Sequence, residues 1–114
     1  MNKNSLQRSS MCIGWTTFQK HEEAEKCATE LVSLGLAFCV QVENPVESHY
    51  MWKEKAASTR EYPVRIKYIE KQGSAIQGWL KKNHPYETPQ WIAIKACDLL
   101  EEYYQWALQD CVKV

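Results

Sequence analysis

A long run of alternating side chains between residues 37 and 53 constrains the fold more than any other feature of the chain. Apolar and polar residues alternate with a period of two on both sides of Pro45, which is the pattern of a β-strand. Because proline cannot donate a ladder hydrogen bond, Pro45 indicates an edge position or a bulge. Residues 54–59 are expected to turn the chain, and residues 62–68 alternate again, with Pro63 giving a second edge signal. The sequence therefore predicts a long antiparallel hairpin.

Before the hairpin, the sequence predicts one strand and one helix. Residues 11–18 form a short apolar run rich in strand formers, which indicates a buried strand. Apolar residues then recur at spacings of three and four, with acidic residues at the start and Gly35 just past the end. This pattern predicts an amphipathic helix of about four turns. Its expected apolar stripe consists of Ala24, Cys27, Ala28, Leu31 and Val32.

After the hairpin, the sequence predicts a helix, a strand and a final helix. Ser74 is expected to cap the first of these helices, which should end near Asn83 because the residue before a proline is pushed out of the helical region. Residues 90–97 alternate as a fourth strand. Asp98 and Glu101 resemble a capping box at the start of the last helix. The expected inner face of that helix consists of Leu100, Tyr104, Ala107 and Cys111.

The order of these elements indicates the fold class. Strand, helix, strand, strand, helix, strand is the split βαβ arrangement of the ferredoxin-like fold. We therefore predict an α+β, ferredoxin-like βαββαβ sandwich with a long hairpin between its second and third strands and an extra C-terminal helix. Residues 1–10 are expected to be a flexible N-terminal tail. Residues 11–114 are expected to form a single domain, because a chain of 114 residues with 45% hydrophobic residues suits one core.

The predicted hairpin is longer than the helices that would cover it. A strand over residues 37–53 measures roughly 55 Å at about 3.3 Å per residue, whereas a helix of about 14 residues reaches only about 21 Å. Tyr50 and Trp52 would therefore project beyond the helical layer, and each such side chain forgoes roughly 1.5 to 3 kcal/mol in water. An open strand edge also invites pairing with another chain. We expect self-association, unless the strand bends at Pro45 and folds back on its own sheet, or the hairpin is shorter.

Charge and composition narrow the classes of function. Fourteen Lys and Arg balance fourteen Asp and Glu, so the field typical of a nucleic-acid or anionic-membrane binder is missing. The sequence has no apolar run near the roughly 20 residues of a membrane span, and its first ten residues lack the apolar centre of a signal peptide. We expect a cytoplasmic protein with protein or small-molecule partners. Its five cysteines, mostly expected to be buried thiols, are Cys12, Cys27, Cys39, Cys97 and Cys111.

Two short segments, SHYMW at residues 48–52 and HPYE at residues 84–87, concentrate aromatic and titratable side chains. Copper(I) favours thiolate or thioether sulfur with imidazole, and copper(II) favours imidazole with oxygen. The donors of these kinds form no ligand pair at helical spacing, so a metal site would have to assemble across the fold or between subunits. These donors are Cys39, His49, Met51, His84 and Glu87.

Each candidate also has a structural interpretation. His84 should lie just beyond a helix C-terminus, where the helix dipole favours the protonated ring and so competes with metal binding. Its structural role would be a hydrogen bond to a nearby backbone group. Tyr50 and Trp52 are typical of interface packing. Lys67 either pairs with Glu87, binds an anion, or lays its stem over apolar surface.

An enzymatic function is the alternative to these interpretations. The candidate side chains include groups able to act as general acid, general base and anion binder. No spacing pairs a nucleophile with its base, and a chain with four glycines has no Gly-rich phosphate loop. We therefore predict a protein that is not an enzyme. The groups weighed for catalysis are Tyr50, Lys67, His84 and Glu87.

Five segments resemble those of one protein family. They are LAFCV at residues 36–40, SHYMWK at 48–53, Glu61 leading into residues 66 and 67, HPYETP at 84–89 and YYQW at 103–106. They occur in the same order as in the CutA family of divalent-cation tolerance proteins and span the chain from residue 11 onward. The resemblance implies a ferredoxin-like subunit in a homotrimer whose long hairpins pair edge to edge between neighbours.

The resemblance also implies a function and a set of site residues. CutA proteins are associated with tolerance to copper and other divalent cations, and some members bind copper. A metal ion in a cleft between subunits is therefore implied, with a trimeric signalling or scaffold protein that binds a small-molecule ligand between subunits as the alternative. The implied metal ligands are His84, Glu87 and Cys39. The implied side chains for a bound cofactor or ligand are Tyr50, Trp52, Lys67, Tyr86 and Trp106.

Four positions depart from the family pattern. Thr16 and Asn83 stand where some members carry a cysteine and a second histidine, so only His84 remains of the positions proposed as copper ligands. Glu54 and Phe38 replace a common glycine and a usual alanine. The departures put specific metal binding in doubt and leave the expected fold unchanged.

Overall fold

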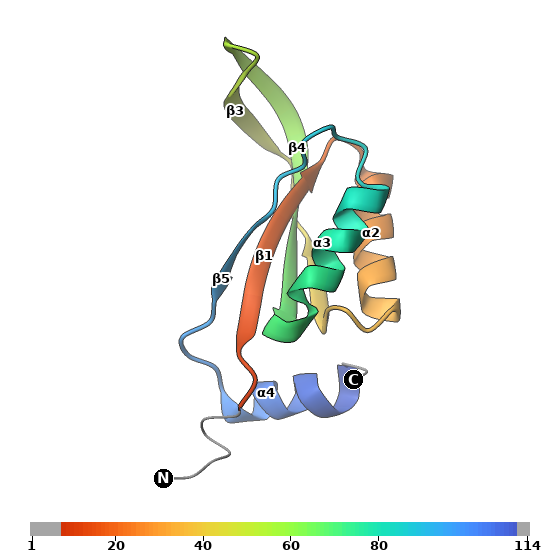
Figure 1. Ribbon diagram of the computed structural model, residues 1–114, viewed down its shortest axis with the longest axis vertical. Coiled ribbons are helices and arrows are strands. Elements are labelled where there is room, and N and C mark those ends of the chain that lie inside the picture. The colour runs from red at the N-terminus through yellow and green to blue at the C-terminus, as the bar shows by residue number, and fades with distance from the viewer. Residues whose placement is uncertain (1–7, 112–114) are drawn as a thin grey trace.

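Strands and helices alternate along the chain in the order that the sequence predicts (Figure 1). The structure is a computed structural model that describes residues 8–111, with side chains up to residue 109. Its elements are β1 (Met11–Phe18), α2 (His21–Ser33), β2 (Cys39–Val42), β3 (Val46–Trp52), β4 (Lys55–Ile69), the 3₁₀ turn η1 (Glu70–Gln72), α3 (Gly73–Asn83), β5 (Ile92–Lys95), α4 (Glu101–Trp106) and the π-helical turn η2 (Ala107–Cys111). None of the described helices is long and apolar enough to span a membrane.

The five strands form an antiparallel sheet in the order β2-β4-β1-β5, and β3 pairs with the outer half of β4. Helices α2 and α3 cover one face of this sheet, and α4 lies across its end, opposite the hairpin tip (Figure 1). The predicted α+β, ferredoxin-like class is confirmed. The fourth strand is shorter than predicted, because only Ile92–Lys95 pairs with β1.

The hairpin is built on β4, which is 15 residues long. Its inner half pairs with β1 and β2, and its outer half pairs with β3 alone. The break predicted at Pro45 is present, since β2 ends at Val42 and β3 begins at Val46. Pro63 lies at this transition, where its carbonyl oxygen accepts the backbone N–H of Glu43. The missing N–H of Pro63 therefore falls where β4 changes partners.

The turn of the hairpin is tighter than the sequence suggested. Lys53 and Glu54 form it alone, with φ of 50° and 68°, and β4 begins at Lys55. The expected turn over residues 54–59 is therefore wrong, because most of that segment belongs to the returning strand. A two-residue turn with positive φ matches the twist of the flanking strands, and here the hairpin adopts it without glycine. The molecule measures 54 × 27 × 24 Å along its principal axes, and the hairpin tip lies at one end of the longest axis (Figure 1).

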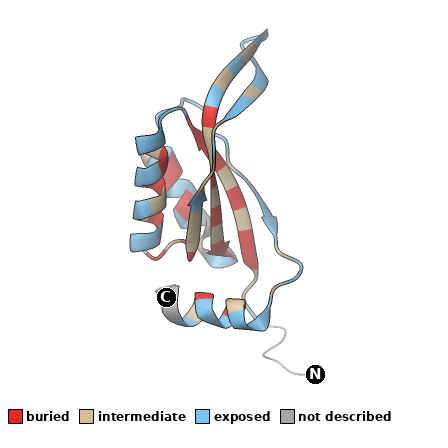
Figure 2. Cartoon of the chain, turned by 180° about the vertical axis from the view of Figure 1, so that it is seen from behind, coloured by how far each residue is buried: buried red, intermediate tan, exposed pale blue. Residues whose placement is uncertain are grey.

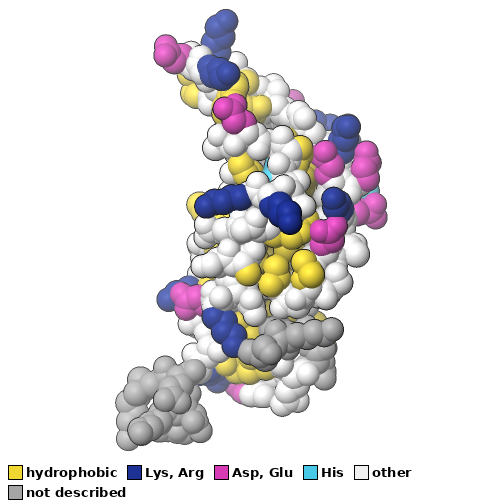
Figure 3. Space-filling model, turned by 45° about the vertical axis from the view of Figure 1, so that its right-hand side comes forward, with side chains coloured by type: hydrophobic (Ala, Val, Ile, Leu, Met, Phe, Trp, Pro, Cys, Tyr) yellow, Lys and Arg dark blue, Asp and Glu magenta, His cyan; other side chains and the backbone are white. Residues whose placement is uncertain are grey.

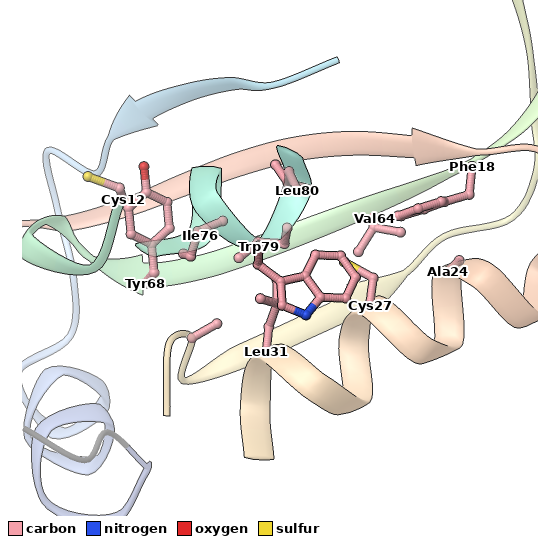
Figure 4. Packing of buried hydrophobic residues seen from close by; sticks show 12 residues of the cluster. Cys12, Phe18, Ala24, Cys27, Leu31, Val64, Tyr68, Ile76, Trp79 and Leu80 are labelled. Carbon is pink, nitrogen blue, oxygen red and sulfur yellow. The ribbon is translucent and has the colours of Figure 1, made fainter. Parts of the chain in front are cut away.

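The main core lies between the sheet and the two helices (Figure 4). Trp79 of α3 reaches across to Leu31 and Cys27 of α2, and its indole N–H donates to Glu30 at 2.9 Å. Alternate residues of β4, such as Val64 and Ile66, face this layer and are fully buried. The other members of the cluster are Cys12, Phe18, Ala24, Ala37, Tyr68, Ile76 and Leu80.

Gly14 lets an aromatic ring lie against the middle of β1. The Trp91 indole crosses this position so closely that a Cβ added to Gly14 would lie 2.2 Å from the ring carbon Cη2. Trp91 also contacts Tyr68, with ring centroids 5.8 Å apart. Gly14 is therefore required by the packing of Trp91 and not by its own backbone conformation.

A second cluster joins α4 to the end of the sheet. It contains Met11, Phe38, Ile69, Tyr104 and Ala107. Leu100, which was expected on the inner face of α4, is instead 76% exposed and is the N-cap residue of the helix. The Cys111 side chain lies outside the described part of the chain. Neither of the two expected helix caps is present. The N-cap residue of α3 is Gln72, so Ser74 lies inside the helix, and no side chain caps the start of α4.

Arg8, within the expected tail, contacts this second cluster. Arg8 forms an ion pair with Glu101 at 2.8 Å and its guanidinium lies 3.8 Å from the centroid of the Tyr104 ring. Residues 1–7 of the expected tail lie outside the described residues.

Most residues of β3 and all four residues of β5 are exposed, as are the outer faces of the helices (Figure 2). Tyr50, Met51 and Trp52 are 42, 66 and 43% exposed. On the sheet face that carries no helix, Ile92 and Ile94 are 62 and 57% exposed. Lysine, arginine and acidic side chains are interspersed elsewhere, and neither sign dominates the face seen in Figure 3.

Candidate functional site

A cleft of about 760 Å³ lies at the base of the hairpin. One wall is the face of β3 that carries Ser48, Tyr50 and Trp52. The other wall is the loop of residues 86–90, which leaves α3 and passes the end of β1. Glu61 of β4 lies at the bottom, because its Cα pairs with Val46 and its side chain therefore shares a face with Ser48 and Tyr50.

Glu61 is the centre of the polar contacts in this cleft. The residue is only 7% exposed, and its Oε2 accepts hydrogen bonds from the Thr17 hydroxyl at 3.0 Å and the Tyr86 hydroxyl at 2.7 Å. Burial raises the pKa of Tyr86, and the hydrogen bond to the Glu61 carboxylate raises it further. The phenol therefore stays protonated and acts as a hydrogen-bond donor at neutral pH.

His84 lies behind this cleft and is fixed by two hydrogen bonds. Its Nδ1 accepts the backbone N–H of Tyr86 at 3.1 Å, so the ring proton is on Nε2, which donates to the Thr17 carbonyl oxygen at 2.8 Å. The ring also stacks on Phe18, with centroids 4.3 Å apart. Burial lowers the pKa of His84 and outweighs the hydrogen bond to Thr17. The net effect of its surroundings therefore favours the neutral ring, and the structural interpretation of His84 as a backbone partner agrees with the geometry.

The three implied metal ligands do not meet within one chain. His84 has both ring nitrogens in hydrogen bonds with the protein, and Glu87 is exposed in the cleft loop. Cys39 pairs with Lys67 in the sheet, six residues along β4 from Glu61, which is about 20 Å at about 3.3 Å per residue. Across residues 8–109, no three His, Cys, Asp or Glu side chains gather closely enough to hold a metal ion. The donor set of a single protomer does not fit a metal centre.

The implied ligand-binding residues divide into two groups. Tyr50, Trp52 and Tyr86 line the cleft together with Glu87. Lys67 and Trp106 lie at the opposite end of the sheet, where both contact Tyr103. The Lys67 ammonium donates to the Tyr103 hydroxyl at 3.2 Å, so the expected pair between Lys67 and Glu87 is not formed.

The remaining candidate donors lie on the hairpin. His49 lines the cleft, and its Nε2 contacts the Glu47 carboxylate at 2.8 Å. Met51 is exposed on the opposite face of the ribbon from Tyr50.

Glu61 and Thr17 were missed as site residues by reasoning from the sequence. Glu61 entered only as part of a family segment, and Thr17 is 44 residues away from it in the chain. One signal in the sequence could have indicated Glu61. It directly precedes the alternating apolar run of β4, and in the hairpin register its side chain faces the same way as Tyr50 and Trp52 of β3.

Comparisons with known proteins agree with this architecture. The family of CutA1 divalent ion tolerance proteins matches residues 12–110. A probable divalent-cation tolerance protein cutA homolog of Encephalitozoon cuniculi is 31% identical over 96 residues, which cover 84% of this chain and 82% of that protein. The crystal structure of CutA1 from a psychrotrophic Shewanella superposes with a TM-score of 0.84 at 33% identity, covering 89% of this chain and 94% of that one. CutA1 from Oryza sativa gives a TM-score of 0.86 at 26% identity, covering 92 and 96%. This chain therefore belongs to the CutA family of divalent-cation tolerance proteins.

Proposed function

We propose that this chain works as a non-enzymatic, homotrimeric protein of the divalent-cation tolerance type, in the cytoplasm, and that the hairpin of β3 and β4 holds the trimer together. The observation that carries this proposal is the hairpin itself, which extends past the helical layer with Tyr50 and Trp52 exposed beside an open strand edge. Burial of Tyr50, Met51 and Trp52 against a neighbouring copy would contribute roughly 1.5 to 3 kcal/mol per side chain to the stability of the assembly. Edge pairing with a neighbouring copy would also satisfy the outer backbone groups of β3.

Light scattering coupled to size-exclusion chromatography tests the assembly. A trimer has three times the 13.3 kDa mass of one chain. Trp52→Ser should shift the protein toward smaller species on dilution, because it removes an exposed aromatic side chain from the interface. Val32→Ser on α2 is the matched control, since Val32 is 44% exposed and Trp52 is 43% exposed. A monomer at micromolar concentration, or equal effects of the two variants, would refute the proposed assembly.

Metal binding, if it is direct, is proposed to occur between subunits, where Glu87 of the exposed cleft loop is available. This placement is supported by the lack of fit within one protomer described above. Calorimetry with Cu²⁺ and Zn²⁺ on reduced protein should then show a saturable site that Glu87→Gln weakens. Absence of saturable heat would mean that the tolerance function does not involve metal binding by this protein.

A second candidate function is a trimeric scaffold that binds a small molecule in the cleft. Its volume falls within the roughly 300 to 1,000 Å³ of ligand sites, and its walls combine aromatic rings with a few polar groups. A thermal-shift screen with metabolites tests this function, with a stabilising compound as the expected result. The cytoplasmic location is supported by the four described cysteines, which are free thiols, and cell fractionation tests it.

A further inference from the structure

The bottom of the cleft presents one acceptor atom that the protein itself does not use. Both hydroxyl donors to Glu61 end on Oε2. Its Oε1 accepts no hydrogen bond from any residue between 8 and 109, and no Lys, Arg or His nitrogen in that part of the chain lies within 4.0 Å of the carboxylate. A buried carboxylate is normally paired with a cation or fully hydrogen-bonded. Glu61 is only 7% exposed as a residue and has donors on Oε2 alone, whereas its Oε1 is not among the fully buried polar atoms of the described residues and is therefore open to the cleft.

The charge of the cleft has one sign. Glu61 and Glu87 both line it, and neither lysine nor arginine does. This contrasts with the whole chain, in which fourteen basic residues balance fourteen acidic residues. The one described lining residue that can gain a positive charge, His49, contacts the carboxylate of Glu47. The cleft therefore attracts a cation.

The walls above Glu61 favour an organic cation over a bare metal ion. Tyr50 is held in place by a hydrogen bond of 2.5 Å between its hydroxyl and that of Thr59, and Tyr86 is held by Glu61. Trp52 already has a cation near its ring, since the Lys53 ammonium lies 5.8 Å from the ring centroid. Aromatic faces attract ammonium and guanidinium groups. A metal ion needs several converging donors, and the described residues gather no three His, Cys, Asp or Glu side chains.

We propose that the cleft binds a protonated amine or a guanidinium group, which donates an N–H to Oε1 of Glu61 while the attached carbon chain lies against Tyr50 and Trp52. This inference rests on the second candidate function above and deepens it by giving the ligand a charge and a donor group. The cationic group belongs either to a free small molecule or to a lysine or arginine of a neighbouring copy. The chemistry at Oε1 is the same in both cases.

A matched pair of probes tests the proposal on the full-length protein. Benzylamine and benzyl alcohol differ in the ammonium group, and ligand-observed NMR titration gives both dissociation constants. We expect benzylamine to bind at least about tenfold more tightly, since a charge-assisted hydrogen bond replaces a neutral one. Glu61→Gln should abolish this preference, and it keeps an oxygen that accepts from Thr17 and Tyr86, so the fold is retained. Glu102→Gln is the control and should keep the preference, because Glu102 is exposed on α4 and does not line the cleft.

The outcomes separate the two sources of the cation. A preference for benzylamine that depends on Glu61 supports the proposal with a free small molecule as ligand. If neither probe is preferred but Glu61→Gln weakens the assembly in light scattering and Glu102→Gln does not, a basic side chain of a neighbouring copy is the source. If neither the preference nor the assembly depends on Glu61, or if Zn²⁺ binds at Glu61 and benzylamine does not compete, the proposal is overturned. A monomeric wild-type protein refutes the proposed assembly alone, because the probe preference is measured separately.

Discussion

Replacing Gly14 with alanine tests whether Trp91 is fixed against β1. The added Cβ would lie 2.2, 2.6 and 2.8 Å from three carbons of the Trp91 ring. Carbon atoms do not approach so closely, and the backbone of β1 is paired on both sides with β4 and β5. The ring therefore has to move, and Trp91 then loses its contact with β1 and part of its contact with Tyr68.

The size of the effect can be worked out from this contact. Inserting a methyl group into a packed site costs about 1 to 3 kcal/mol. A tryptophan buries about 150 to 250 Å², so re-exposing a third of this area costs a further 1 to 2 kcal/mol at about 25 cal/mol per Å². We expect Gly14→Ala to lower the free energy of unfolding by about 2 to 5 kcal/mol. Gly78 is the control, because a Cβ there meets nothing within 4 Å and alanine in a helix gains about 0.5 to 1 kcal/mol.

Urea unfolding followed by circular dichroism measures both changes. All variants must be compared at one protein concentration, because the stability of an assembling protein depends on it. In a Trp91→Ala background, Gly14→Ala should lower stability by less than about 0.5 kcal/mol, since the clashing ring is gone. The reasoning is refuted if Gly14→Ala is neutral in the wild-type background or equally harmful in both backgrounds.

Three further predictions concern buried polar groups. Thr16→Val should raise the free energy of unfolding by about 1 to 2 kcal/mol in urea titrations, because the buried Thr16 hydroxyl has no hydrogen-bond partner among the described residues, and a loss of stability would contradict this. Tyr86→Phe should lower the free energy of unfolding by about 1.5 to 3 kcal/mol, because the buried Glu61 carboxylate loses a hydrogen-bond donor. An unchanged urea midpoint would show that water replaces the phenol. Burial lowers the pKa of His84 below its ordinary 6.5. On acidification, His84 is therefore protonated in the unfolded chain before it is protonated in the folded chain, and the free energy of unfolding should fall as the pH drops below about 6.5. His84→Gln should flatten that slope, and an equal slope in both proteins would exclude His84 as its source.

The parts of the fold that could be predicted from the sequence are those with a local cause. The apolar run of residues 11–18 became β1 with the same bounds, because a buried strand shows its pattern directly. Gly35 has a φ of 76°, as expected of a glycine just past a helix end. The break at Pro45 and the end of α3 before His84 both follow from the restrictions that proline imposes.

The errors arose where contacts distant in the chain decide the outcome. Lys53 and Glu54 carry no turn signal of their own, and the pairing of β3 with β4 holds them at positive φ. Ser74 lies inside α3 because the preceding 3₁₀ turn starts the helical segment earlier. Part of the cleft was predictable from the sequence, since Tyr50, Trp52, Tyr86 and Glu87 lie in the two segments that concentrate aromatic and titratable side chains. Its central carboxylate was not, because the contact between Glu61 and Tyr86 spans 25 residues and leaves no spacing to read.

The single continuous strand β4 makes the reach of the hairpin an adjustable quantity. Its outer half pairs with β3 alone, so residues can be added or removed there without moving the pairing of its inner half. The side-chain period of two allows such changes only in steps of two residues on each strand, or about 7 Å of reach, if the aromatic face is to stay aligned with Glu61. Insertions of odd length would invert the tip while leaving the body of the sheet intact.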